Sequence, residues 1–246
     1  MRATLRLYLE DPHRVEADAT IVALREDLLA FDCSVFYPGG GGQPHDLGTV
    51  VFPGGASLEI RSVQADAHGV IWHGFAGPLP ELAEGSLARL RLDAPRRNAL
   101  TRYHTVLHVL NTIALRDYGA WITGAQIATG YARIDFKLEG LSAAMCADIE
   151  RKVNAELDAK RRLKAYYIPA QEFEARKDLL RTLDAMPPVI DGRVRVVEID
   201  GFDAQACGGT HVDHTGELGR FGIFRTENKG RINKRLYVRL DAVPAR

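Results

Sequence analysis

The segment Arg102-Tyr-His-Thr-Val-Leu-His-Val-Leu110 decides how the middle of the chain folds, because its apolar residues recur at helical spacing. In a helix, His104 and His108 project from one face, one turn apart, so that both imidazoles can bind a single metal ion. Much later in the chain, Cys207-Gly-Gly-Thr-His211 repeats the spacing with a thiol and an imidazole. Four ligands of this kind suit a tetrahedral zinc site. The two segments together predict one zinc ion held by distant parts of the chain.

The combination of the two pairs carries this prediction, since either pair alone often arises by chance. Gly208 and Gly209 strengthen it, because glycines let the backbone wrap closely around an ion. Two kinds of zinc site remain open. Four protein ligands suit a structural zinc without chemistry, whereas a catalytic zinc normally keeps one position open but can also become five-coordinate. A zinc protease is disfavoured, because no glutamate follows the first histidine.

The composition is that of an ordinary globular protein, with 246 residues of which 46% are hydrophobic and 26% charged. The formal net charge is zero, so no overall field attracts a polyanion or a membrane surface, and a local patch must hold any nucleic acid. Three cysteines far apart in sequence, Cys33, Cys146 and Cys207, argue against a disulfide scaffold. Because there is no apolar leader or long apolar run, we expect a cytoplasmic protein with no membrane and no DNA partner.

The first part of the chain predicts a β domain. Alternating apolar and polar residues indicate strands at 4–10, 15–24, 28–35, 58–63 and 87–92. Clusters of proline and glycine separate these strands. Short strands with frequent turns are typical of a small barrel or sandwich. We therefore expect a first domain over residues 1–94.

After residues 93–95 the pattern changes to helices that alternate with strands. We expect helices at 96–118, from Ser142 to about 163, and at 171–183. Strands are expected at 131–138, 166–169, 194–199 and 236–240. This alternation predicts a second domain of α/β or α+β type over residues 95–246.

Several motifs, in order along nearly the whole chain, resemble the editing domain of alanyl-tRNA synthetases and its free-standing AlaX-type relatives. The two metal pairs are the first of them. The glycine-rich Phe36-Tyr-Pro-Gly-Gly-Gly-Gly-Gln-Pro-His-Asp46 is similar to a family stretch that precedes the metal domain. The others are Thr123-Gly-Ala-Gln126 with the strand at 132–136, the segment 196–207 that leads into Cys207, and the closing segment 226–237. Their joint presence is highly specific.

The resemblance implies an α+β fold, with a small N-terminal β-barrel domain followed by a two-layer α/β editing domain that holds one zinc ion. The chain has no room for an aminoacylation core, which implies the medium-length AlaX kind. Such proteins act in trans on mischarged tRNA(Ala), chiefly Ser-tRNA(Ala) or else the glycyl form, and hydrolyse the aminoacyl ester. We expect a monomer or a weak homodimer.

The resemblance also implies which residues form the site. The metal ligands are His104, His108, Cys207 and His211. Gln126 is the candidate that contacts the substrate or the attacking water. The expected substrate-binding residues are Gly40, Gly41, Gly42, Gln43, Asp46, Thr105 and Thr210. Relatives often carry threonine where this chain has Leu107, so a hydroxyl contact at that position is not expected.

The chemistry of ester hydrolysis fits a zinc site. The ion can lower the pKa of water to about 7 or polarise the carbonyl, or it can hold the α-amino group while another water attacks, and the sequence leaves this choice open. A site that hydrogen-bonds the serine hydroxyl can reject alanine by a factor of ~10⁴. The glycine run lacks the Lys-Ser/Thr that follows in a phosphate-binding P-loop.

The end of the chain is locally basic and is a candidate tRNA contact, although most such runs are solvated surface. Only Glu227 and Asp241 oppose its eight basic residues, which are Arg220, Arg225, Lys229, Arg231, Lys234, Arg235, Arg239 and Arg246.

Two rival hypotheses remain: a tRNA-binding module whose zinc is purely structural, and a zinc hydrolase of another small ester. His214, three residues after His211, is more typical of a surface residue than of a fifth ligand.

Overall fold

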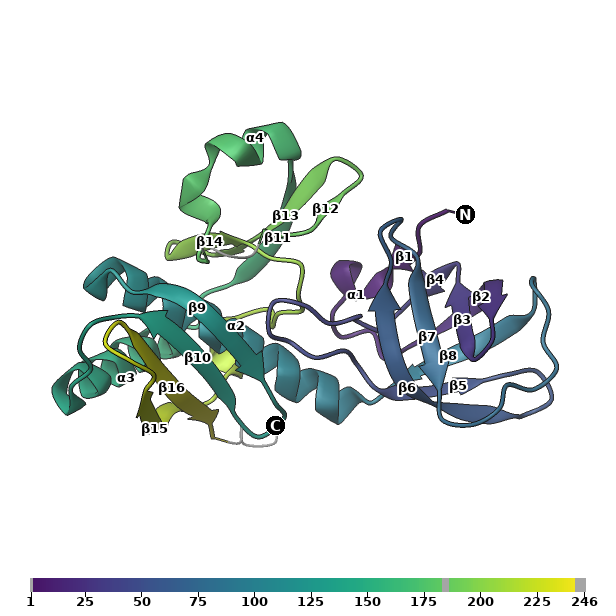
Figure 1. The fold of residues 1–246 in the computed structure, drawn as a ribbon, viewed down its shortest axis with the longest axis horizontal. Helices are drawn as coiled ribbons and strands as arrows, with labels where there is room; N and C mark the ends of the chain where they lie inside the picture. The colour runs from purple at the N-terminus through teal and green to yellow at the C-terminus, as the bar shows by residue number, and fades with distance from the viewer. Residues whose placement is uncertain (1, 183–185, 242–246) are drawn as a thin grey trace. The chain divides into compact units, whose positions relative to one another are not determined.

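Strands of the N-terminal part, among which β2 and β8 alternate buried with more exposed residues, close into a barrel in the order β2-β3-β7-β6-β5-β8 (Figure 1). In the computed structural model, which describes residues 2–182 and 186–241, all neighbouring strands of this barrel pair antiparallel. Their bounds are β2 Glu16–Arg25, β3 Leu28–Phe31, β5 Gly48–Val51, β6 Ser57–Ala65, β7 Ile71–Phe75 and β8 Leu87–Leu92. Large side chains such as Phe31, Phe75 and Leu90 fill the interior. The predicted barrel is thereby confirmed.

Two details of the barrel segment differ from the sequence prediction. The strand expected at 4–10 is wrong: only β1 (Leu5–Arg6) is extended, and it pairs with β4 (Cys33–Ser34) before the short helix α1 (Leu7–Glu10). Leu7 and Tyr8 are both buried, which consecutive residues of a strand cannot achieve on one face. Strands β5 and β7 were not predicted, and β7 is buried at every position, so that it lacks the alternation by which strands are recognised.

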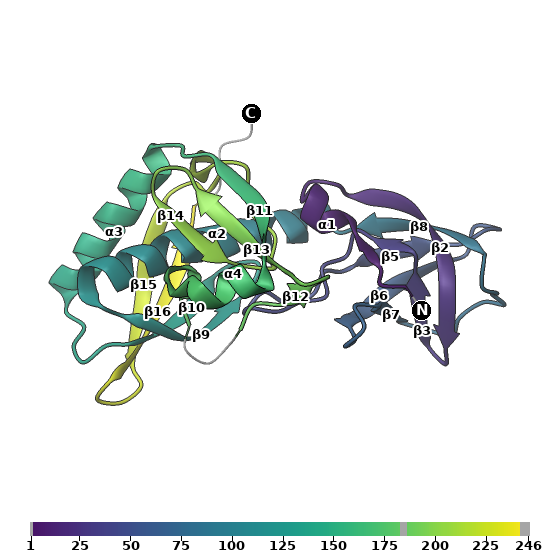
Figure 2. The same ribbon diagram turned by 90° about the horizontal axis from the view of Figure 1, so that it is seen from above.

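The rest of the chain contains a larger antiparallel sheet in the order β15-β16-β10-β9. Its bounds are β9 Trp121–Ile127, β10 Ala132–Lys137, β15 Phe221–Asn228 and β16 Asn233–Leu240. Helices α2 (Ala94–Tyr118) and α3 (Ala143–Asp158) cover one face, as Figures 1 and 2 show. Leu110 of α2, Val153 of α3 and Ile134 of β10 belong to the same buried core.

A second, smaller sheet carries the segment that leads to Cys207. Strand β13 (Arg193–Ile199) pairs with β11 (Leu163–Pro169), β12 (Val189–Ile190) and β14 (Asp203–Ala206). Helix α4 (Ala170–Ala175) packs its Phe173 against Val194 and Val196 of this sheet. The α+β class is thus confirmed.

The helix predicted at 96–118 is confirmed as α2, whereas the other two predicted helices are shorter than expected. Ser142 caps α3 through a hydrogen bond from the Met145 amide, as expected, but the helix ends at Asp158. Lys160 then takes a positive φ of 49°, which turns the chain toward β11. The helix expected at 171–183 is only α4 followed by a 3-10 turn at Lys177–Leu179, and residue 183 lies outside the described residues.

Contacts along the chain divide it into two compact units. The barrel unit consists of Met1–Gly40 and Pro44–Asn98, and the α+β unit consists of Gly41–Gln43 and Ala99–Arg246. Three residues of the glycine-rich loop therefore belong to the unit that contains both metal pairs. Within the described part of the chain, no helix is long and apolar enough to cross a membrane.

Candidate metal centre

The four predicted ligands lie together in the α+β unit. Helix α2 presents His104 and His108 from successive turns, and the loop after β14 supplies Cys207 and His211. One ligand atom of each residue lies within 4.8 Å of those of the other three. All three imidazoles are buried. This group could hold a metal ion.

The distances within the group fit a zinc ion. The Cys207 Sγ lies 3.4 Å from the Nε2 atoms of His104 and of His211. A tetrahedron with ordinary zinc–sulfur and zinc–nitrogen bonds separates these atom types by about 3.5 Å. The Nδ1 of His108 is also buried and has no hydrogen-bond partner among the described residues. Such an unpaired polar atom, facing no protein donor or acceptor, is compatible with a metal-binding role for this imidazole.

Burial sets the protonation of the imidazoles. It lowers the pKa of His104 to about 4, with the Arg195 guanidinium adding to the effect. It lowers the pKa values of His108 and His211 well below the usual range, and the neighbouring histidines contribute. Burial raises the pKa of the Cys207 thiol. At neutral pH the imidazoles are therefore neutral, which is the form that binds metals.

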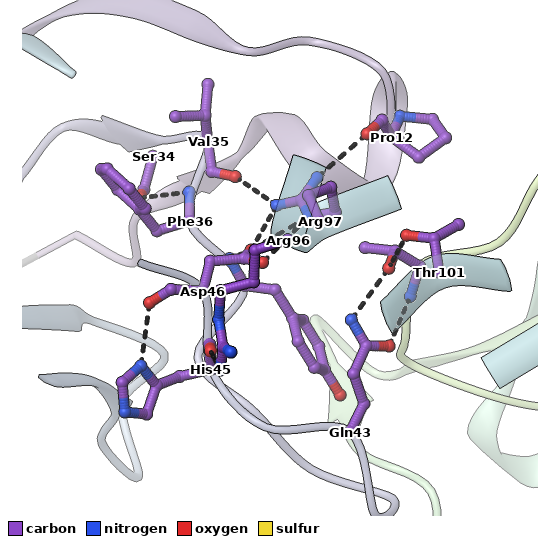
Figure 3. A network of polar contacts seen from close by, with 12 residues as sticks. Pro12, Ser34, Val35, Phe36, Gln43, His45, Asp46, Arg96, Arg97 and Thr101 are labelled. Carbon is purple, nitrogen blue, oxygen red and sulfur yellow. Dashed lines mark hydrogen bonds and ion pairs between the residues drawn. The ribbon is translucent and has the colours of Figure 1, made fainter. Parts of the chain in front are cut away.

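Gln43 fixes the orientation of His104. Its Oε1 lies 2.7 Å from the His104 Nδ1, and because an amide oxygen only accepts, the imidazole donates from Nδ1. The amide nitrogen of Gln43 donates to the Thr210 hydroxyl at 2.9 Å, and this hydroxyl also contacts the Thr101 hydroxyl at 2.7 Å. The tautomer with a proton on Nδ1 leaves the Nε2 lone pair of His104 pointing toward Cys207. Figure 3 shows Gln43 beside Thr101.

Thr105 fixes the orientation of the His211 imidazole. Its hydroxyl donates to the Thr101 carbonyl at 3.0 Å and accepts from the Val212 amide at 3.2 Å. A hydroxyl has one proton and two acceptor sites, so its 3.1 Å contact with the His211 Nδ1 is one in which the imidazole donates. The Nε2 of His211 is then free to bind an ion. Hydrogen bonds of this kind, one step behind the ligands, tune and orient metal sites.

The backbone around Cys207 can approach the helix only because it contains glycine. A Cβ on Gly209 would overlap the ring of His104, and a Cβ on Gly208 would press on the Pro188 ring. The buried guanidinium of Arg195 holds the same loop, since its Nη1 donates to the carbonyls of Cys207 at 3.0 Å and Gly209 at 2.9 Å. Arg195 was not among the predicted site residues, because its link to this loop is a backbone contact that side-chain spacing cannot reveal.

A further buried network supports the helix at His108. The Gln205 Nε2 donates to the His108 carbonyl at 3.1 Å and to the Asp203 carboxylate at 2.7 Å. The Thr112 hydroxyl bonds the same carbonyl and the same carboxylate. Asp203 is in turn paired with Arg181. Asp203 and Gln205 belong to β14 and Thr112 to α2, whereas Arg181 follows the 3-10 turn at Lys177–Leu179. No local pattern in the sequence singled these residues out.

Comparisons with known proteins place this centre in a family. Residues 194–237 match the family described as the threonyl and alanyl tRNA synthetase second additional domain. The chain is 32% identical to the alanyl-tRNA editing protein AlaX-M of Saccharolobus solfataricus, over 95% of the chain and 98% of that relative. It is 34% identical to the AlaX-M of Methanosarcina barkeri, over 96% and 99%. The chain belongs to the AlaX-M family.

The AlaX-M match confirms the resemblance seen in the sequence. The chain is also 36% identical to the alanine–tRNA ligase of Pyrococcus furiosus, over 91% of its own length. It spans only 24% of that ligase, and the same share of the ligase of Korarchaeum cryptofilum. The similarity to these larger enzymes thus concerns one region of them.

In this AlaX-M family member, the glycine-rich loop lies against the edge strand β9. The Ile127 amide donates to the Gly42 carbonyl at 2.9 Å, and a Cβ on Gly42 would press on the backbone of Ala125. Gly40 is exposed and belongs to the barrel unit, whereas Gly41 and Gly42 belong to the α+β unit. Their predicted contacts with substrate stay predictions.

Gln126, the candidate catalytic residue, lies in β9 and is exposed. Its Oε1 accepts a hydrogen bond from the Arg133 Nε at 2.7 Å, across the pairing of β9 with β10. Leu107 is a buried core residue of α2. Its side chain packs in the core of the α+β unit.

Asp46 lies in the barrel unit and forms a buried ion pair with Arg97 (Figure 3). It also accepts a hydrogen bond from the Tyr37 amide at 2.7 Å. The guanidinium bonds two further backbone carbonyls, of Val35 at 2.7 Å and of Pro12 at 3.0 Å. This network gives Asp46 a structural task, besides the substrate contact predicted for it.

Not every basic residue near the end of the chain is a surface charge. The Lys234 ammonium is buried and donates to Asn228 and to the carbonyls of Gly230 and Arg231. Arg235 is paired with Asp135. Arg246 lies outside the described residues. His214 begins a 3-10 turn and takes part in its capping box, so that it is not a member of the metal group.

Proposed function

We propose that this protein is a trans-editing hydrolase that removes the amino acid from mischarged tRNA(Ala), chiefly Ser-tRNA(Ala), by zinc-dependent hydrolysis of the aminoacyl ester. One observation carries the proposal. A buried centre of three imidazoles and one thiol lies in a chain that matches AlaX-M proteins over nearly their whole length. A cytoplasmic location, and a monomer or weak homodimer, go with this proposal.

The chain's own residues prepare the centre in three ways. His104, His108, Cys207 and His211 would hold the ion. Burial keeps the imidazoles neutral, and Gln43 and Thr105 turn two Nε2 lone pairs inward. When bound, a zinc ion supplies a Lewis acid that polarises a carbonyl or acidifies water. Such a prearranged polar site favours the charge that develops on an ester oxygen during hydrolysis.

We propose that Gln126 orients the ester or the attacking water. Its amide oxygen is bonded to Arg133, and its amide nitrogen has no hydrogen-bond partner among the residues that the structure describes. The nitrogen can therefore donate to a substrate carbonyl. Gln126 is also exposed, so that a large substrate such as an aminoacylated RNA end can reach it.

Selection of serine requires a hydrogen bond to its hydroxyl. Such a bond rejects alanine by a factor of ~10⁴, since alanine would leave the partner group unpaired. We propose that the polar groups available for this are those of Gln43, Thr210 and the backbone of Gly40, Gly41 and Gly42. Thr105, whose hydroxyl already makes three hydrogen bonds, would have to exchange one of them for the substrate. Thr105 and Thr210 already bond to groups that orient the imidazoles, so a substrate hydroxyl would extend an existing network.

The test is deacylation of Ser-tRNA(Ala) and Ala-tRNA(Ala) by the purified protein, with and without a chelator. We expect loss of the seryl ester, little loss of the alanyl ester, and inhibition by the chelator. A folded, metal-replete protein that leaves the seryl ester intact would contradict the proposal and favour a tRNA-binding module with a structural zinc. Rapid hydrolysis of a small ester, with no preference for the tRNA ester, would favour the other rival.

A further inference from the structure

Three aromatic rings form an exposed cluster on the larger sheet of the α+β unit. Tyr131 is 41% exposed and Phe224 is 48% exposed, which is unusual for side chains of this size. The ring centroids of Tyr131, Phe224 and Tyr237 lie 6.1 to 6.5 Å from one another. We call these three residues the aromatic cluster.

The cluster lies on the sheet face that the helices do not cover. In β10 and β16, Ala132, Ile134, Leu236 and Val238 are buried in the core beneath α2 and α3. Tyr237 alternates with these residues and therefore points away from the helices. In Figure 1 the sheet lies in front of α2 and α3, with this uncovered face toward the viewer.

Basic side chains surround the aromatic cluster. The Arg225 guanidinium lies over the Tyr237 ring, 5.0 Å from its centroid. The strand register places Arg225, Tyr237, Arg133 and Gln126 in one row across the sheet, and paired residues share a face. The row therefore ends at the residue proposed to orient the ester.

The charge of this face is positive after its ion pairs are taken into account. Arg225 pairs with Glu227, and Arg235 pairs with Asp135. The remaining cations in strands β10 and β16, at the same alternation, have no carboxylate partner among residues 2–182 and 186–241. They are Arg133, Lys137 and Arg239. Unpaired cations beside exposed rings suit a polyanion that also carries flat apolar groups.

We propose that this face binds unpaired nucleotides of the tRNA substrate, with bases stacked on Tyr131 and Phe224 and phosphates held by Arg133 and Arg239. The proposal rests on the proposed function and extends it to the surface that leads to Gln126. Exposed aromatic rings stack only on bases that are free of a duplex, and flanking arginines supply attraction to the backbone. An apolar protein partner would have to bury these cations unpaired, which is costly.

The first test measures binding without any hydrolysis. A fluorescent single-stranded RNA of about ten nucleotides is titrated with the full chain and followed by anisotropy. We expect Phe224→Ala and Tyr131→Ala each to weaken binding about tenfold, because a lost stacking partner costs this much. Phe224→Trp should restore the affinity. Tyr167→Ala removes an exposed aromatic ring from the other sheet, on β11, and should bind like the wild type.

The second measurement separates this inference from the proposed function. In Ser-tRNA(Ala) deacylation, Phe224→Ala should raise KM about tenfold and leave kcat unchanged. If the wild type deacylates but Phe224→Ala and Tyr131→Ala keep both KM and RNA affinity, the inference is overturned while the proposed function stands. If the wild type binds the RNA through these residues but never deacylates, the proposed function fails instead.

Two further outcomes would overturn the inference. One is a wild-type protein that binds a double-stranded RNA of the same sequence more tightly than the single strand. The other is a change in sedimentation, rather than in RNA affinity, when Phe224 is replaced, because the face would then join two copies of the chain. Thermal unfolding should be unchanged in these variants, since the replaced side chains are exposed.

Discussion

At the scale of single residues, the centre depends on which nitrogen of each imidazole carries a proton. Gln43 and Thr105 each bond the Nδ1 of a histidine whose Nε2 lies 3.4 Å from the Cys207 sulfur. Without these partners, either tautomer and other ring orientations become available. Residues behind the ligands should therefore matter for metal affinity nearly as much as the ligands themselves.

Gln43 should be needed for tight zinc binding. Replacing it with leucine, which has a similar size but no amide, should weaken zinc binding by about 10–100-fold, because the His104 Nδ1 loses its acceptor. The measurement is a competition titration of the metal-free protein with a zinc-binding dye. Gln64→Leu removes an exposed glutamine from β6 and serves as the control. Equal zinc affinity in the two variants would contradict the orienting role of Gln43.

The grouping of the four candidate ligands could be predicted from the sequence, but the hydrogen bonds of the residues behind them could not. Two pairs at four-residue spacing and glycines beside Cys207 indicate a metal site without any knowledge of the fold. The bond between Gln43 and His104 joins residues 61 positions apart, and only the folded chain brings them together. Lys234 illustrates the same limit, since its burial among backbone carbonyls cannot be recognised in a run of basic residues.

At the scale of elements, the buried ion pair of Asp46 with Arg97 ties the first turn of α2 to the chain around Tyr37. Both side chains are almost fully buried. Removing one partner of such a pair leaves the other charge uncompensated in the interior, at a cost of about 3–5 kcal/mol. Hydrogen bonds between Tyr37 and Asp46 join the two ends of the glycine-rich segment.

We therefore predict that Asp46→Asn destabilises the protein by about 3 kcal/mol, because the asparagine keeps the shape but leaves the Arg97 charge unpaired. Urea unfolding monitored by circular dichroism measures the loss. Asp27→Asn is the control, since Asp27 forms only an exposed pair with Arg61. A loss for Asp46→Asn no larger than that of the control would show that the pair has no structural role.

Element prediction succeeded where one face of a strand or helix is buried and the other exposed. Strand β2 alternates along its length, and helix α3 buries Ile149, Val153 and Leu157 on one face, so both were found. Strand β7 is buried on both faces and was missed. The helix at 171–183 was too long because Phe173 and Leu179 pack on the small sheet from separate short turns, and not from one continuous helix.

At the scale of the whole molecule, His73 makes stability depend on pH. The ring is fully buried in the barrel, where Ser34 and the Leu29 carbonyl bond its nitrogens, and burial lowers its pKa from 6.5 to about 4. The unfolded chain takes up a proton near pH 6.5, whereas the folded chain does so only near pH 4. The contribution of His73 to the free energy of unfolding is therefore fully present above pH 6.5 and is lost as the pH falls toward 4.

The expected size of this loss is on the order of 3 kcal/mol, from the difference between the two pKa values. The His73→Gln variant keeps donor and acceptor groups but cannot titrate. We expect the free energy of unfolding to fall less between pH 7 and pH 4.5 in this variant than in the wild type. Comparison of the two pH slopes removes the contribution of the other histidines. Parallel slopes would show that His73 is not the titrating group.

We propose that zinc held by His104, His108, Cys207 and His211 is required to hydrolyse the seryl ester. The most direct test titrates zinc into metal-depleted protein and records bound zinc, thermal unfolding and the rate of Ser-tRNA(Ala) deacylation on the same samples. We predict that the rate rises with bound zinc, saturates at one ion per chain, and stays low in Cys207→Ala. A folded protein that hydrolyses the ester equally without zinc, or not at all when zinc is bound, would contradict this account.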